Sequence, residues 1–297
     1  MLYYNRYTQV IESESTPGHR LLKYLYGKAL GRLILRLFLI KPITSRCIGW
    51  WMSTRRSKKH IVPFAKRYHI DLNAFEKAPE AYTHFNDFFC RKFKPGQRPI
   101  DSTPNTLCFP CDGRHLGFQT LADAQCFFIK GTSFSLKQLL QDDTLAQHFH
   151  QGSCVISRLA PIDYHRFHFP CDGIPQAPKA IQGLLYSVHP TALQHNWRIF
   201  AENKRCLTVM QTQPYGLIAM IEVGACCIGS LQETFQPNRP YRKGDEKGYF
   251  AFGGSTIILL FEAQRVQLAP DLINCTQHGL ELYAHMGDIL GTAIKNP

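Results

Sequence analysis

The sequence lacks acidic residues where its basic residues are most concentrated. No Asp or Glu occurs from Ser15 to Ile70, although thirteen of the 34 Lys and Arg lie there. The rest of the chain carries 21 bases against 22 acids, so the formal net charge of +12 comes from this one segment. A local basic excess of this kind predicts contact with an anionic surface.

The basic segment also lacks an uncharged run long enough to cross a membrane. No window of about 18 residues within it is free of charge, which argues against a transmembrane helix. The first twenty residues are polar and carry both signs of charge. They therefore do not resemble a secretory signal peptide.

The spacing of charges in this segment predicts an amphipathic helix. Lys28, Arg32 and Arg36 recur every fourth residue and would share one helix face. The opposite face carries Leu30, Leu33, Ile34, Leu37 and Phe38. With tryptophans at 50 and 51 nearby, we predict a helix that lies in an anionic membrane interface. The alternative is a surface helix that covers the core. We expect no nucleic-acid partner, because the bases alternate with aliphatic residues and not with stacking aromatics.

The eleven cysteines lack the spacing of a disulfide framework or a metal site. Their number is odd and their spacing irregular. Cys108 and Cys111 form a C-x-x-C pair, but no second pair completes a tetrahedral zinc site, and a turn follows instead of a helix. We therefore expect reduced thiols, no metal and reducing, cytosolic surroundings.

Turn and strand signals predict an α+β fold with a strand-rich core. Residues 1–19 look like a weakly ordered lead, 20–70 like a basic helical segment and 71–98 like further helix. We expect strands at 125–129, 154–159, 206–212, 217–223 and 256–261, a hairpin turn at 214–216 and one helix from about 136 to 150. We place a domain boundary at residue 70, with a membrane-associating segment (1–70) before the main domain (71–297).

Gly253 and Gly254 precede Ser255 at the start of the apolar run 257–261. Glycine tolerates backbone conformations that bring a serine hydroxyl close to the preceding carbonyl. Ser255 could therefore act on a bound substrate or on its own backbone. The G-x-S-x-G pattern of α/β-hydrolases is absent, because Thr256 follows the serine.

His165 and His168 are candidates for proton transfer. The pentapeptide Phe-Pro-Cys-Asp-Gly occurs at 109–113 and again at 169–173, and supplies Asp112 and Asp172 as partners. A Ser–His–Asp group, whose members need not be close in sequence, would give nucleophilic serine chemistry. Ordinary half-buried histidines are the alternative.

Five motifs occur in order over roughly residues 80 to 262. They are NDFFCRKFKPGQRP (86–99), PCDG (110–113), YHRFH (164–168), VGACCIGS (223–230) and GGST (253–256). Together they resemble the ordered motifs of the phosphatidylserine decarboxylases, which are pyruvoyl enzymes that mature by self-cleavage. Many members have Leu-Gly-Ser-Thr at the cleavage site; here Gly253 replaces the Leu, and the Gly–Ser pair is kept.

The resemblance implies a role for each candidate residue. Asp112, which matches the family motif better than Asp172, would orient His168, and His168 would take the proton from Ser255. The Ser255 oxygen would attack the Gly254 carbonyl. Cleavage of this zymogen between 254 and 255 would leave a long chain (1–254), a short chain (255–297) that stays bound to it, and a covalent pyruvoyl group derived from Ser255 as the cofactor.

The activity that the resemblance implies is that of a lyase in phospholipid biosynthesis. Phosphatidylserine would form a Schiff base with the pyruvoyl group, lose carbon dioxide and leave as phosphatidylethanolamine, with His165 as proton donor. We expect a peripheral enzyme on the cytoplasmic face of the cell membrane, bound to an anionic surface, and the family's habit favours a homodimer. The alternatives are a serine hydrolase that acts on lipid esters and a non-enzymatic, membrane-docked lipid-binding module.

Overall fold

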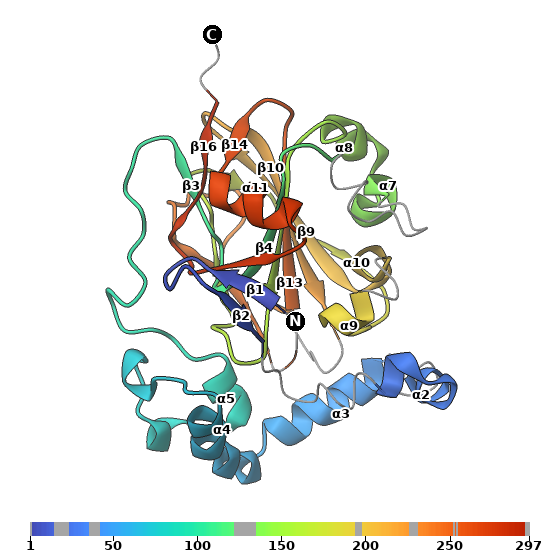
Figure 1. Cartoon of the computed structure of the whole chain (residues 1–297), viewed down its shortest axis with the longest axis vertical. Helices are drawn as coiled ribbons and strands as arrows, with labels where there is room; N and C mark the ends of the chain where they lie inside the picture. The colour runs from blue at the N-terminus through green and yellow to red at the C-terminus, as the bar shows by residue number, and fades with distance from the viewer. Residues whose placement is uncertain are drawn as a thin grey trace.

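The structure, a computed structural model of the chain, describes residues 2–14, 24–35, 42–121, 135–193, 198–225, 231–251, 253 and 255–294. A large sheet forms the centre of the molecule and carries smaller sheets and helices on its two faces (Figure 1). The predicted α+β class with a strand-rich core is confirmed.

The central sheet has ten strands and is mixed, because β1 pairs in parallel with β15 while the other pairs are antiparallel. The strand order is β2-β1-β15-β4-β5-β13-β10-β9-β7, and β8 also pairs with β9. The strands span Leu2–Asn5 (β1), Ile11–Ser13 (β2), Gly113–Phe118 (β4), Cys154–Leu159 (β5), Ile174–Pro175 (β7), Lys179–Ile181 (β8), Arg205–Thr212 (β9), Gly216–Gly224 (β10), Ser255–Phe261 (β13) and Glu281–Ala284 (β15). All of β13 is buried, so it forms the middle of the core.

Two three-stranded sheets and one helix cover one face of the central sheet. The sheets have the orders β14-β16-β3 and β11-β12-β6. Side chains alternate along β13, so Ile257 and Leu259 enter the hydrophobic cluster on this face while Ile258 and Leu260 enter the cluster on the other. The covering elements are Thr106–Cys108 (β3), Arg166–His168 (β6), Leu231–Glu233 (β11), Glu246–Phe250 (β12), Val266–Leu268 (β14), Pro270–Gln277 (α11) and Ile289–Ala293 (β16).

Short helices pack against the second face. They are Leu136–Leu140 (α7), Asp143–His148 (α8), Pro190–Leu193 (α9) and Ile199–Glu202 (α10). The prediction of a single helix over 136–150 was wrong. Gln141 takes the left-handed conformation with φ 48° and ends α7, and the Asp142 carboxylate accepts a hydrogen bond from the Leu145 N–H and caps α8.

The first residues form a hairpin that belongs to the central sheet. Strand β1 pairs with β2 and with β15, and the Arg6 guanidinium donates two hydrogen bonds, of 2.7 and 2.8 Å, to the Asp271 carboxylate. The prediction of a weakly ordered lead was therefore wrong for residues 2–14. The partners of this hairpin lie at the other end of the chain, so no local pattern indicated them.

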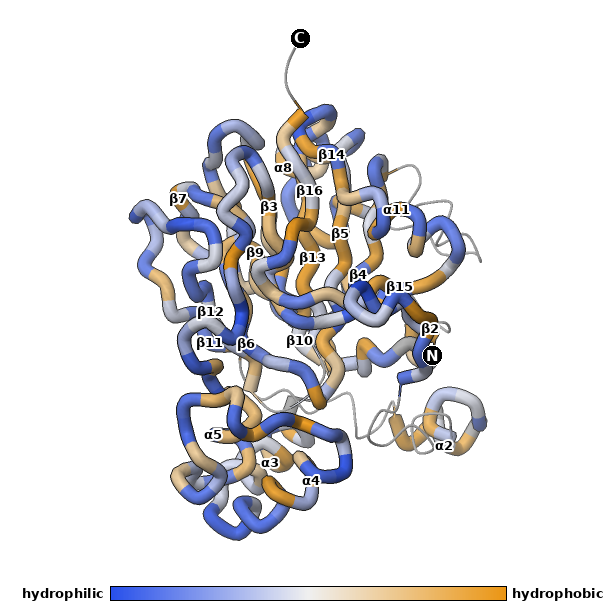
Figure 2. The backbone as a smooth tube through the Cα atoms, turned by 60° about the vertical axis from the view of Figure 1, so that its left-hand side comes forward, coloured by the Kyte–Doolittle hydropathy of each residue, from blue (hydrophilic) through white to orange (hydrophobic). Residues whose placement is uncertain are grey.

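A helical module, residues 42–89, lies at one end of the sheets (Figures 1 and 2). It contains Pro42–Met52 (α3), Arg55–His60 (η2), Ile61–Arg67 (α4), Leu72–Ala74 (η3), Pro79–Ala81 (η4) and Phe85–Phe89 (α5). Its own cluster of Ile61, Ala65, Tyr82, Phe85, Phe88 and Phe89 crosses the predicted boundary at residue 70. The helix predicted over 71–98 is broken into short pieces, because Phe75 and Tyr82 are extended.

Helix α2 (Ala29–Ile34) lies beside this module. Its Leu30, Leu33 and Ile34 are exposed and not packed on the core. Among the helices in the described ranges, none has the length and hydropathy needed to span a bilayer.

The predicted strands of the core are confirmed where the structure describes them. Strand β5 has the predicted bounds, and β9, β10 and β13 each begin one residue earlier than predicted. Thr212 lies opposite Gly216 across the predicted hairpin turn. The strand predicted at 125–129 lies outside the described residues.

Candidate active site

Ser255 is the first residue of β13 and lies within the large sheet. It is opposite Leu159 of β5 and Gly224 of β10, and it is fully buried. Gly253, two residues before it, has φ 146°, in the region that favours glycine. Gly254, the predicted cleavage partner, lies outside the described residues. Paired strands on both sides thus hold the serine where the chain enters the core.

The ring of His165 contacts Ser255. Its Nδ1 is 3.4 Å from Ser255 Oγ, and its Nε2 is 3.0 Å from the carbonyl oxygen of Ala160. A carbonyl can only accept a hydrogen bond, so Nε2 carries the proton and Nδ1 presents its lone pair to the serine. The distance of 3.4 Å is at the long limit for a hydrogen bond.

The surroundings of His165 keep it neutral. The ring is fully buried and stacks on Phe89 of α5, with ring centroids 4.0 Å apart. Burial, and to a smaller extent the nearby Arg91 guanidinium, lowers the pKa of His165 to about 3. In the uncut chain the ring of His165 is therefore uncharged at neutral pH and presents a lone pair, not a proton, to Ser255.

His168, at the end of β6, points to a different partner. Its Nδ1 donates a hydrogen bond of 2.8 Å to the Gly244 carbonyl, which leaves the lone pair on Nε2. Nε2 is buried, and no hydrogen-bond partner for it lies among the described residues. Burial lowers the pKa of His168, while the Gly244 carbonyl, Glu246 and Asp112 act against this shift. A neutral ring with a free, buried acceptor atom is what a general base requires.

Asp112 is buried between β3 and β4 and is bound by a single arginine. Arg98 donates to both carboxylate oxygens at 3.0 Å from Nε, and to Oδ2 at 2.6 Å from Nη2. The Met286 N–H donates a further hydrogen bond of 2.9 Å. Asp172, in the second copy of the pentapeptide, is exposed and accepts from the Lys243 N–H instead.

The two pentapeptides run side by side, and this brings Asp112 near His168. The Cys108 N–H donates to the Pro170 carbonyl, and the His168 N–H donates to the Pro110 carbonyl. Asp112 acts on the pKa of His168 through the electric field, but the described residues form no hydrogen bond from His168 to Asp112 or to Ser255. The structure brings Ser255 and His165 into contact, and the catalytic roles of all four residues stay predictions.

Several residues around the site were not singled out from the sequence. Arg98 binds Asp112, Phe89 stacks on His165, and Arg91 donates hydrogen bonds of 2.8 and 2.9 Å to the carbonyls of Ile162 and Asp163. Phe89, Arg91 and Arg98 all belong to the 86–99 motif. That motif indicated the family, but its spacing did not indicate what these side chains contact.

The cysteines of the C-x-x-C pair are buried free thiols. Cys108 and Cys111 lie in the core, and burial raises the pKa of Cys108 to about 12. A thiol with a raised pKa is a poor nucleophile and a poor metal ligand.

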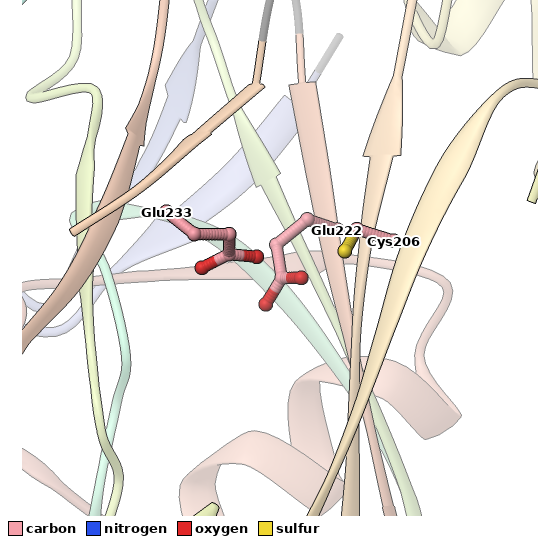
Figure 3. Close-up of side chains that lie close together, drawn as sticks. All are labelled: Cys206, Glu222 and Glu233. Atoms are coloured by element: carbon pink, nitrogen blue, oxygen red, sulfur yellow. The ribbon is translucent and has the colours of Figure 1, made fainter. Parts of the chain in front are cut away.

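A different cluster has the geometry of a metal site. Ligand atoms of Cys206, Glu222 and Glu233 lie within 4.8 Å of one another, and Figure 3 shows the two carboxylates facing each other. The buried Lys247 ammonium lies 3.0 Å from Glu222 Oε1 and 2.8 Å from Glu233 Oε1. Its positive charge already compensates the two carboxylates, so this arrangement is explained as an internal ion triad that joins β12 to β10 and β11.

Comparison with known proteins gives a consistent picture. The sequence model of the phosphatidylserine decarboxylase family matches residues 85–291. The chain is 42% identical over 291 residues to the phosphatidylserine decarboxylase proenzyme of Chlamydia trachomatis serovar D, covering 98% of this chain and 97% of the relative. It is 41% identical to that of Fusobacterium nucleatum (97% and 96% covered) and 38% identical to that of Desulfitobacterium hafniense (99% and 98%).

The ion triad predicts that Lys247→Met destabilises the fold in a pH-dependent way. Breaking a buried pair costs about 3–5 kcal/mol. Burial already raises the pKa of Glu222 to about 8, and Lys247 acts to lower it. Without the lysine the folded-state pKa rises further. The two folded chains bind different numbers of protons at Glu222 only above the native pKa, so the deficit in the free energy of unfolding grows as the pH increases from about 8 to about 10. Urea denaturation at both pH values measures this.

Lys92→Met is the matched control, because the exposed Lys92 ammonium lies 3.9 Å from Glu246. A surface pair of this kind contributes about 0–1 kcal/mol. Equal stability of the two variants at both pH values would contradict the proposed importance of the triad.

Proposed function

The chain belongs to the phosphatidylserine decarboxylase family, and we propose that it makes a pyruvoyl group from Ser255 to decarboxylate phosphatidylserine. The burial of Ser255 supports self-cleavage most directly. A serine that hydrolyses lipid esters must be reached by the lipid, whereas a fully buried serine is within reach of the chain's own backbone. This observation disfavours the lipid-ester hydrolase.

Self-cleavage would proceed through the peptide bond that precedes Ser255. The Ser255 oxygen attacks the Gly254 carbonyl carbon, the C–N bond breaks, and the freed amine takes a proton, which leaves an ester. Loss of a proton from Cα and departure of the Gly254 carboxylate then give dehydroalanine. Water releases its nitrogen as ammonia and leaves a ketone. One residue thus supplies the nucleophile and the atoms of the cofactor.

The strand pairing supports an enzyme whose two chains stay together after cleavage. The short chain would contain β13, β14, β15, β16 and α11. In it, β13 pairs with β5 and β10, and β15 pairs with β1 and β4, all of which belong to the long chain. Buried apolar surface and ladder hydrogen bonds would hold these strands without a covalent link.

We propose that Asp112 and His168 serve cleavage and that His165 serves decarboxylation. The free Nε2 of His168 and the influence of Asp112 on its pKa support the first assignment. The position of His165 beside residue 255 supports the second, because the proton that replaces the departed carboxyl group must arrive there. The same contact also favours a rival assignment, in which the neutral His165 itself takes the proton of Ser255.

A pyruvoyl group supplies a conjugated carbonyl that accepts the electron pair left by departing carbon dioxide. For this step the residues around the site must exclude water and keep the reacting groups correctly oriented. Full burial of His165 and its stacking on Phe89 exclude water from one side of residue 255.

Substrate access supports peripheral binding to the cytoplasmic face of the cell membrane. Exposed large apolar residues gather on α2, α3 and α4, at Leu30, Leu33, Ile34, Ile43, Trp50, Trp51 and Val62. Exposed bases accompany them at Arg55, Arg56, Lys58, Lys59, Lys66 and Arg67. Apolar residues beside bases suit an anionic interface. The same helical module carries Phe89, so a bound bilayer would lie near the site. A homodimer stays a prediction.

Ser255→Ala is expected to stay a single chain of 34.0 kDa, because no oxygen is present to attack Gly254. The native protein should give two chains, the smaller with a blocked, keto-bearing first residue. Intact mass spectrometry measures both. Ser157→Ala, at another fully buried serine, is the matched control and should still cleave. A native protein that releases carbon dioxide while uncut would refute the pyruvoyl proposal.

The two histidines can be separated by substitution. His168→Ala is expected to stay uncut, whereas His165→Ala should cleave normally and release carbon dioxide at least about a hundredfold more slowly, since general acid catalysis contributes about 10²–10⁴-fold. Denaturing gels and a carbon dioxide assay distinguish these steps. If His165→Ala stays full-length, the contact with Ser255 is that of the cleavage base and the rival assignment holds.

Loss of bases from the helical module should weaken vesicle binding. Arg55→Gln and Arg56→Gln together should make the free energy of binding to phosphatidylserine-containing vesicles less favourable by about 2 kcal/mol, because each base near the surface contributes about 1 kcal/mol. Lys179→Gln, at an exposed lysine on β8, is the control. Equal binding of both proteins in a sedimentation assay would place the membrane contact elsewhere.

A further inference from the structure

The N-terminal hairpin ends on a buried acid that no sequence motif includes. Glu14 follows β2, and its side chain is 1% exposed. The Glu14 carboxylate accepts two hydrogen bonds from Arg158, of 2.9 Å from Nη2 to Oε2 and of 3.1 Å from Nη1 to Oε1. Its Oε1 also lies 3.3 Å from Arg114 Nε. One carboxylate thus contacts two guanidiniums that are themselves 3% and 5% exposed.

The two arginines lie next to each other on the strands that lead to the site. Arg114 of β4 is directly opposite Arg158 of β5, and Leu159, the next residue, is opposite Ser255. Like charges facing each other on adjacent strands repel, and each lowers the other's tendency to stay protonated. Arg158 also binds the Glu281 carboxylate, at 2.9 and 2.6 Å. Glu14 lies between the pair: it accepts two hydrogen bonds from Arg158 and is within ion-pair distance of Arg114.

From Arg114 the contacts continue to the catalytic histidine. Arg114 Nη1 binds the Asp163 carboxylate, which accepts the Ala160 N–H at 2.6 Å. The Asp163 backbone N–H in turn donates a hydrogen bond to the Ala160 carbonyl. That carbonyl is the acceptor for His165 Nε2. The turn of residues 160–163 is therefore closed by Asp163, and it fixes the proton of His165 on the nitrogen that faces away from Ser255.

We infer that Glu14 is a positioning residue for the reaction at residue 255. It acts through Arg114, Asp163 and the Ala160 carbonyl on the ring orientation and tautomer of His165. Without the Glu14 charge, two buried donors of Arg158 lose their acceptor and the Arg114 guanidinium loses a neighbouring negative charge. Asp163 is then the nearest carboxylate for the whole Arg114 guanidinium. Asp163 is then drawn away from the Ala160 N–H, and the turn that orients His165 is released. This inference rests on the proposed roles of Ser255 and His165.

Glu14→Gln in the full-length chain tests the inference. Glutamine keeps the shape of the side chain and removes the charge. His165→Ala identifies the step, cleavage or decarboxylation, that needs this histidine. Glu14→Gln should slow the same step by about tenfold to a hundredfold, as expected for a misplaced catalytic group. For decarboxylation the fall should be in kcat per mole of pyruvoyl, with KM unchanged, because substrate contacts are left intact. For cleavage it should be in the first-order rate constant.

Glu12→Gln is the matched control, because Glu12 is in the same hairpin and binds Tyr3, Asn5 and Thr8 within it. It should behave like the native chain. A Glu14→Gln protein with a lower unfolding midpoint but native rate constants per folded, pyruvoyl-bearing chain would show a merely structural role and overturn the inference. If that variant does not accumulate as folded protein, Glu14→Asp replaces it, with an intermediate loss of rate expected and a native rate contradicting the inference.

Separate results test the proposed function and the positioning role of Glu14. A native chain that releases carbon dioxide without a pyruvoyl group would refute the proposed function. The effect of Glu14→Gln would then be measured as kcat per mole of enzyme, and a tenfold or larger loss there would still support positioning, whereas no loss would refute it.

Discussion

Strand β13 is paired on both edges, with β5 and with β10, and this pairing organises the core of the molecule. All seven residues of β13 are buried, and both neighbouring ladders are antiparallel. Its side chains supply both hydrophobic clusters, so neither face of the sheet could form without it. The first residue of this strand is Ser255. A reacting group at the end of a strand so firmly held has little freedom to move, and its partners must be brought to it.

Buried ions provide much of that positioning. Lys247 connects the sheet of β11 and β12 to β10, and the pair Arg114–Arg158 connects the N-terminal hairpin to the strands beside Ser255. Burying charge is costly, so such groups add specificity of arrangement more than net stability. Each buried charge tolerates few alternative geometries. The elements that carry them are therefore held in one register around the site.

The helical module faces in two directions. On its inner side Phe89 stacks on His165, and Arg91, just after the module, donates to the carbonyls of Ile162 and Asp163 in the turn before this histidine. On its outer side it exposes Trp50, which is 72% accessible, among basic residues. The surface proposed to meet the lipid and Phe89, which contacts the ring of His165, thus belong to one packed unit with its own apolar cluster.

Local patterns in the sequence were enough to predict β5, β9, β10 and β13, the motifs and the family, because apolar runs and motif spacing can be recognised without knowledge of contacts. They indicated Ser255, His165, His168 and Asp112 for the same reason. The three-dimensional arrangement alone shows that His165 is the histidine in contact with Ser255 and that residues 2–13 add two strands to the central sheet. Those facts depend on side chains that meet across long separations in sequence, such as Glu14 with Arg158, and no local periodicity records such a meeting.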